Sequence, residues 1–95
     1  MEFRGNNYKI IIRSDENTNH FIPHCHVEFT DGSIASISID NNYTILAMSG
    51  KAKIDDYKKP VEMIKRNVQN LRKEWNEFSK STYKFELENG QYFLK

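Results

Sequence analysis

The chain has 95 residues, a formal net charge of +1 and 38% hydrophobic residues. This length allows one domain with a modest core, and the composition excludes a disordered chain. A charge so close to zero excludes strong nonspecific attraction to nucleic acid or to an anionic membrane. One cysteine cannot form an intramolecular disulfide, and we find no signal peptide or long apolar run, so we expect a cytoplasmic protein without membrane contact.

The N-terminal part of the chain predicts one strand. Residues 1 to 7 are polar, and we expect them to be frayed. The β-branched content of the segment from Tyr8 to Arg13 predicts the first strand. A polar loop from Ser14 to Asn19 then leads to the next strand.

All three histidines and the cysteine lie between Asn19 and Phe29. Pro23 disfavours a helix before it and suits the start of an extended segment, which predicts a strand from His24. Alternate side chains of a strand share a face. One face therefore carries His24, His26 and Glu28. The other, apolar face carries Cys25, Val27 and Phe29, so we expect it to face the core and Cys25 to be a buried, unreactive side chain.

The Asp31-Gly32 pair predicts a hairpin after the histidine strand. A three-residue loop of Asp31, Gly32 and Ser33 keeps the apolar faces of the two strands in phase. This register predicts that Glu28 lies opposite Ser36 and that His26 lies opposite Ser38.

The segment from Tyr43 to Met48 predicts a further strand, and residues 51 to 59 are ambiguous between a short helix and a loop. A long helix is predicted from about Pro60 to Lys80, because apolar residues follow spacings of three and four. These residues are Val61, Ile64, Val68, Leu71, Trp75 and Phe78. The basic residues of the helix predict a solvated outer side. They are Lys65, Arg66, Arg72, Lys73 and Lys80.

The C-terminal segment predicts a second hairpin with Asn89-Gly90 as its turn, pairing Leu87 with Tyr92. We therefore expect an α+β fold: a three- to four-stranded antiparallel meander packed on one long C-terminal helix, plus a terminal β-hairpin. Residues 1–95 form one domain in this prediction, with 83–95 as an added hairpin. An isolated hairpin is marginally stable, so it should pack on the body of the protein or form a homodimer with a second copy.

Three segments of the chain resemble a known family. Ser14-Asp15-Glu16, the segment from Pro23 to Glu28, and Glu74-Trp75-Asn76-Glu77-Phe78 resemble small bacterial proteins catalogued as a domain of unknown function, number 4160. The resemblance covers roughly residues 8 to 80, and the Pro-His-x-His-Val core is its most specific part. This chain has Ile22 where the family more often has a second proline, and members often stop near the end of the helix. The resemblance implies no established activity. It does imply a setting of toxin-antitoxin-style gene pairs, and hence a small partner protein encoded nearby or an RNA target.

Three interpretations of the histidines stay open. In the first, His24 and His26 are polar residues of a strand, hydrogen-bonded to Ser36, Ser38 or loop backbone. In the second, His20, His24, His26 and Glu28 hold a divalent metal such as zinc and leave one coordination position open, as in catalytic zinc sites. Cys25 points to the other face, which argues against a closed structural zinc site.

The third interpretation is acid and base catalysis without a metal. Imidazoles can give and take protons at neutral pH, and a nearby cation can stabilise the charge that develops when RNA is cleaved. His20, His24 and His26 are the candidate acid and base, and Arg13 is the candidate cation. Two histidines on one strand approach a substrate from the same side, so His20 is the better partner for either of them.

The sequence thus predicts a small binding or regulatory module of toxin-antitoxin type with a histidine cluster on a strand. The alternative is a histidine-dependent or metal-dependent hydrolase that acts on RNA.

Overall fold

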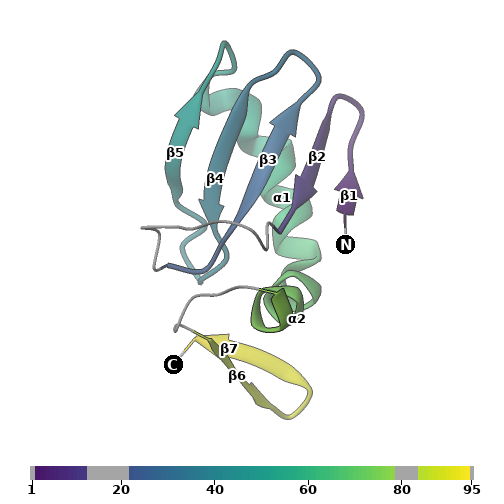
Figure 1. Cartoon of the computed structure of the whole chain (residues 1–95), viewed down its shortest axis with the longest axis vertical. Helices are drawn as coiled ribbons and strands as arrows, with labels where there is room; N and C mark the ends of the chain where they lie inside the picture. Colours follow the sequence, from purple (N-terminus) through teal and green to yellow (C-terminus); the bar gives the residue numbers. More distant parts are fainter. Residues whose placement is uncertain (1, 13–21, 79–83, 95) are drawn as a thin grey trace.

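The computed structural model describes residues 2–12, 22–78 and 84–94. Five antiparallel strands form a sheet in the order β1-β2-β3-β4-β5, so strands that follow one another in the chain are neighbours in space (Figure 1). The strands are β1 (Glu2–Arg4), β2 (Tyr8–Ile11), β3 (His24–Phe29), β4 (Ile34–Ser38) and β5 (Ile45–Ser49). The α+β class and the meander are confirmed, but the sheet has one strand more than the predicted three to four.

The additional strand is β1, which lies in the segment predicted to be frayed. Phe3 pairs with Ile10 of β2 and packs against the core. The Gly5 N–H donates to the Tyr8 carbonyl at 2.9 Å and closes the turn between the two strands. A three-residue strand has too short a pattern to be recognised in the sequence, and one apolar side chain is enough to anchor it.

The loop between β3 and β4 has the predicted length but lies one residue earlier. The Phe29 N–H donates to the Ser33 carbonyl at 2.8 Å, so the loop is residues 30–32, with Gly32 at φ 92°. The Ser33 N–H also donates to the Asp31 carboxylate at 2.8 Å, which holds Ser33 at the end of the loop. As a result His26 lies opposite Ser36 and not opposite Ser38. Side chains alternate every two residues, so the two faces stay as predicted.

Two helices replace the single long helix of the prediction. They are α1 (Lys58–Arg66) and α2 (Val68–Phe78), preceded by the short 3-10 helix η1 (Ile54–Tyr57). Asn67 separates them: its N–H is shared between the Met63 and Ile64 carbonyls, and its side-chain amide donates to the Met63 carbonyl at 2.9 Å. Such side-chain competition for backbone groups bends or ends a helix. No helix in the described ranges is long and apolar enough to span a membrane.

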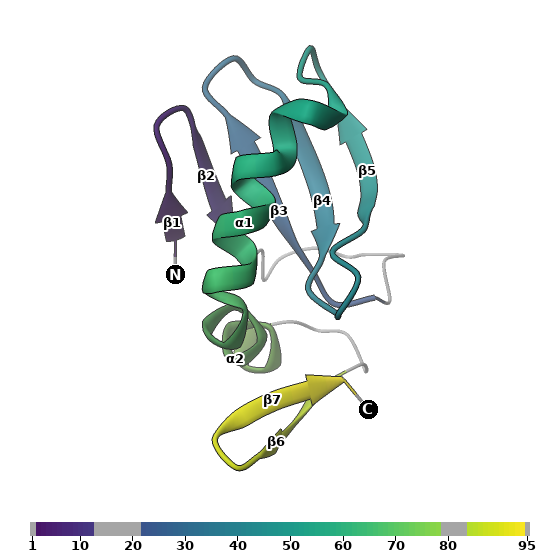
Figure 2. The same ribbon diagram turned by 180° about the vertical axis from the view of Figure 1, so that it is seen from behind.

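The core lies between one face of the sheet and the helices. Figure 2 shows α1 crossing this face, which we call the covered face; the opposite one is the open face. Cys25, Val27, Ala35 and Ile37 are fully or almost fully buried on the covered face, as predicted for the first two. Burial raises the pKa of the Cys25 thiol to about 12. Cys25 is therefore a neutral core residue at physiological pH.

The terminal hairpin consists of β6 (Phe85–Glu88) and β7 (Gln91–Leu94) and has the predicted register, with Leu87 opposite Tyr92. It packs on α2 (Figure 1). Asn76 donates to the Phe85 carbonyl at 2.9 Å and accepts from the Phe85 N–H at 2.8 Å. The Tyr92 N–H donates to the side-chain oxygen of Gln69. Side chains of α2 thus hold the backbone of both hairpin strands.

Arg72 corrects the prediction of a wholly solvated basic side of the helix. Its guanidinium is buried and donates to the Ile39 carbonyl at 2.8 Å and to the Tyr92 carbonyl at 2.7 Å. The same group lies over the ring of Phe85, 5.1 Å from its centroid. Arg72 therefore joins the end of β4 to the terminal hairpin. Lys65, Arg66 and Lys73 are exposed, as predicted.

Candidate functional site

His24 and His26 lie side by side on the open face. Their ring centroids are 5.1 Å apart, with the ring planes at 71°. The two residues are 2% and 6% exposed, so both imidazoles are buried. The predicted alternation therefore brings these two residues together, but it does not present them as freely accessible groups.

Among the described residues, His24 contacts Ile22 and Trp75 as well as His26. Its Nδ1 lies 2.8 Å from the Ile22 carbonyl oxygen. A carbonyl oxygen can only accept a hydrogen bond, so Nδ1 carries the hydrogen, and Nε2 is the acceptor when the ring is neutral. On its other side the ring contacts Trp75 of α2, with centroids 5.2 Å apart. The sequence placed Trp75 in the core but gave no signal that it would contact a histidine.

His26 borders a shallow hollow on the open face. The hollow has a volume of about 260 Å³. Its lining comes from β3, β4 and β5, and comprises His26, Ile34, Ala35, Ser36, Ala47, Met48 and Ser49. The Ser36 hydroxyl oxygen lies 3.5 Å from Nδ1 of His26, at the outer limit of a hydrogen bond. Strand β5 itself was predicted, but its register was not, and the register places Ala47 opposite Ser36.

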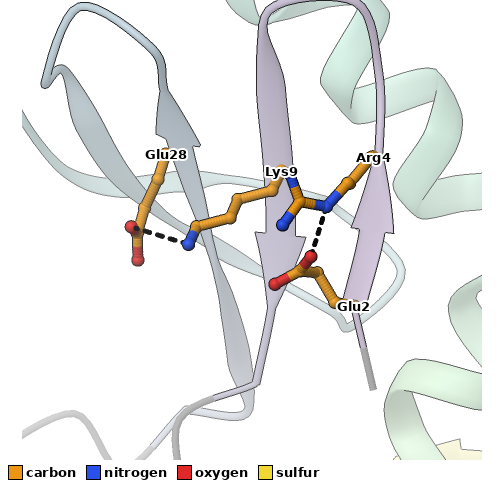
Figure 3. Close-up of polar contacts among 4 residues, drawn as sticks. All are labelled: Glu2, Arg4, Lys9 and Glu28. Carbon is orange, nitrogen blue, oxygen red and sulfur yellow. Dashed lines mark hydrogen bonds and ion pairs between the residues drawn. The ribbon is translucent and has the colours of Figure 1, made fainter.

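Glu28 follows the histidines on the open face and lies within a group of charged side chains. Lys9 of β2 lies opposite Glu28, with Nζ 3.9 Å from the carboxylate. Arg4 lies opposite Lys9 and pairs with Glu2 on β1 (Figure 3). Acidic and basic groups therefore cover the part of the open face formed by β1, β2 and the end of β3.

A polar network stands beside His24 at the other end of the sheet. Ser38, opposite His24, donates its hydroxyl hydrogen to the Asp40 carboxylate at 2.8 Å and accepts from the Thr44 N–H at 2.8 Å. Burial raises the pKa of Asp40, but hydrogen bonds from the Asn42 N–H, the Ser38 hydroxyl and the Tyr43 N–H outweigh it and leave the pKa below its ordinary value. This network fixes the loop that leads into β5.

The metal site predicted from the sequence combines His20 with His24, His26 and Glu28. Arg13 and His20 lie outside the described residues. Within the ranges 2–12, 22–78 and 84–94, no three side chains of His, Cys, Asp or Glu form a group that could hold a metal ion. The pair His24 and His26 alone is one ligand short of the three protein ligands typical of catalytic zinc.

A larger hollow of about 590 Å³ lies away from the histidines, near the β3–β4 loop and the start of α1. Its charged lining mixes three acidic and three basic residues: Asp31, Asp55, Asp56, Lys51, Lys58 and Lys59. Size alone does not make it the functional site, because these charges offset one another and none is buried.

A family model described as "Domain of unknown function (DUF4160)" matches residues 7–76, most of the chain. The chain belongs to this family. The DUF4160 match extends from the turn before β2 to Asn76 in α2, so it includes both described histidines and Trp75. The terminal hairpin lies beyond it. No curated protein and no solved structure matches the chain. The description of DUF4160 names no activity.

Proposed function

We propose that this chain is a small binding and regulatory module of toxin-antitoxin type, which contacts a partner protein through the open face of its sheet. The observation that carries the proposal is the burial of the imidazoles: His24 and His26 are 2% and 6% exposed and pack on each other. In this arrangement the two imidazoles serve to support the open face and to keep its side chains in place. A catalytic imidazole would need a nitrogen within hydrogen-bond reach of a substrate.

The composition of the open face supports a macromolecular partner. The hollow beside His26, at about 260 Å³, is small compared with sites that enclose a small molecule, which span about 300 to 1,000 Å³. Around it lie small residues such as Ser36 and Ala47, and beyond it the charges of Lys9 and Glu28. Small residues allow close approach, and charges of both signs at a rim select a complementary partner.

The test is a titration of the purified chain with the protein encoded by the neighbouring gene, followed by calorimetry. We expect a 1:1 complex that Lys9→Glu weakens at least about tenfold, because a like-charge contact replaces a favourable one. The matched control is Lys73→Glu on the exposed side of α2, which should leave the affinity unchanged. Absence of a complex, or a complex that Lys73→Glu weakens and Lys9→Glu does not, would contradict the proposal.

The orientation of His24 favours a second candidate, a hydrolase that acts on RNA. The Nδ1–H bond to the Ile22 carbonyl leaves Nε2 as the proton acceptor of the neutral ring, as a general base or a metal ligand requires. His20, His26 and Arg13 would complete this site. RNA cleavage that persists in EDTA and is lost in His26→Ala would support metal-free catalysis. Cleavage that needs zinc, with a zinc-dependent rise in melting temperature that is lost in the His24→Ala, His26→Ala double variant, would support a metal site.

A further inference from the structure

The two outer strands of the sheet differ in how they are protected. β1 has three residues, and two of them, Glu2 and Arg4, are charged. β5 is the outer strand at the other end of the described sheet, and its residues Ile45–Ser49 include no charge and no proline. An outer strand presents backbone N–H and C=O groups to its surroundings and pairs readily with another strand unless charge, proline or cover prevents it. β5 is therefore the edge suited to pairing.

Apolar side chains and two hollows flank β5. Met48 is 40% exposed, and Ile54 of η1, on the covered side of β5, is 68% exposed. The covered side has a hollow of about 350 Å³ lined in part by Ile45, Ile54 and Val61. The open side has the hollow of about 260 Å³ beside His26. Side chains of an added strand alternate between the two faces, so a strand placed beside β5 can direct side chains into both hollows.

The charges around β5 indicate which strand fits it and in which direction. From residue 40 to residue 50 the chain has one charged residue, Asp40, and the bases Lys51 and Lys53 follow. In antiparallel pairing of two copies centred on Met48, Lys51 and Lys53 of one copy lie opposite the uncharged residues Ile45 and Tyr43 of the other. Parallel pairing would bring like charges together. An antiparallel second copy of β5 therefore meets no like charge along the paired strands.

We propose that a second copy of this chain pairs with β5, antiparallel and about a two-fold axis at Met48, so that one sheet continues through both copies. The bulge of β5 lies before Ala47, at the register shift between Ser36 and Ile37, so Ala47–Ser49 is the regular part available for pairing. In this register Met48 lies opposite Met48 of the other copy on the covered side. Ala47 lies opposite Ser49 of the other copy on the open side.

The proposed dimer changes the hollow beside His26 on the open face. Ala47 and Ser49 both line the hollow beside His26. In the dimer, Ser49 of the second copy stands next to Ala47, so each hollow gains a wall from the other copy. The terminal hairpin is less suited to pairing than β5. Its backbone at Phe85 and Tyr92 is already hydrogen-bonded to side chains of α2.

Sedimentation equilibrium of the full chain tests the dimer. We expect wild type to form dimers, and we expect Met48→Lys or Met48→Glu to raise the dissociation constant at least about a hundredfold, because two like charges then meet at the axis. An equal mixture of the two variants should form mixed dimers, seen as one copy of each in native mass spectrometry. Restored pairing in the mixture would also show that both variants are folded.

The control variant is Leu87→Lys in the hairpin, where the native side chain is 62% exposed. It should leave the dimer intact. A wild-type protein that is monomeric at about millimolar concentration would overturn the proposal, since such an affinity is too weak for a specific dimer. A dimer that Leu87→Lys dissociates while Met48→Lys does not would also overturn it, and would place the contact at the hairpin.

Discussion

The covered face and the open face of the sheet are made by the same strands, and β3 contributes to both. Its covered side carries Cys25 and Val27, which belong to the buried hydrophobic core. Its open side carries His24 and His26, which are also buried but meet Ile22, Trp75 and Ser36 through polar and ring contacts. Burial alone therefore does not distinguish the two faces. The covered face therefore stabilises the fold through apolar packing, whereas polar and ring contacts fix the side chains of the open face.

Cysteine reactivity gives the largest expected contrast between the faces. Burial raises the pKa of the Cys25 thiol to about 12, so this thiol stays almost entirely protonated at pH 8. Adding Arg4→Cys, at an exposed position on the open face, should give one thiol that reacts with a disulfide reagent at least about a thousandfold faster than Cys25. Urea should make both react at similar rates. Two rapidly reacting thiols in the folded variant would show that the covered face is not closed.

Alanine substitutions at two neighbouring residues of β4 measure how much each face contributes to the free energy of unfolding. Ile37, on the covered face, is fully buried, and Ser36, on the open face, is almost so. We expect Ile37→Ala to lower the free energy of unfolding by about 3 to 4 kcal/mol through lost contacts and a cavity. Ser36→Ala should lower it by less than about 1 kcal/mol. Urea unfolding followed by circular dichroism measures both, and equal losses would contradict the assignment of the core to the covered face.

His24 tests whether polar contacts hold the open face. His24→Ala removes the bond to Ile22 and the contact with Trp75, and we expect a loss of about 2 kcal/mol in the free energy of unfolding. His24→Asn keeps a donor near the position of Nδ1 and should recover about half of that loss. Fluorescence of the single tryptophan reports the same contact. If neither variant changes stability or the emission of Trp75, then the ring contributes nothing to this face.

Asp40 gives a smaller, pH-dependent effect. Its pKa is lowered in the folded protein, so its carboxylate stabilises the fold above the ordinary carboxyl pKa, and this contribution is lost as the pH falls through the lowered value. We expect Asp40→Asn to lower the free energy of unfolding by about 0.5 to 1 kcal/mol at pH 7, because the charge-assisted bonds become neutral ones. The difference from wild type should shrink as the pH falls below the ordinary carboxyl pKa. If the difference in the free energy of unfolding grew as the pH fell, the pKa of Asp40 would be raised in the folded protein and not lowered.

The sequence predicted the faces of β3 because alternation depends only on neighbouring residues. It also predicted the terminal hairpin, since Asn89 at φ 53° and Gly90 at φ 78° have the backbone that an Asn-Gly turn needs. A loop shifted by one residue changed the partner of His26 from Ser38 to Ser36 without exchanging the faces.

Features that depend on distant contacts were missed. The apolar stripe continues across Asn67, so its spacing hides the break between α1 and α2. Arg72 has the sequence context of a surface residue, and its burial follows from meeting Ile39 and Tyr92. Phe78 fits the stripe yet is 52% exposed. The contact of Trp75 with His24 and the contribution of Ala47 to the hollow belong to the same class.

The most direct measurement is an NMR titration of the isotope-labelled chain with the protein encoded by the neighbouring gene. The account predicts that the backbone signals of Lys9, His26 and Ser36 on the open face shift or broaden on binding. The signals of Glu62 and Lys65 on the exposed side of α1 should stay unchanged. Changes confined to α1, with the open face unaffected, would contradict the claim that the histidine-bearing face is the contact surface.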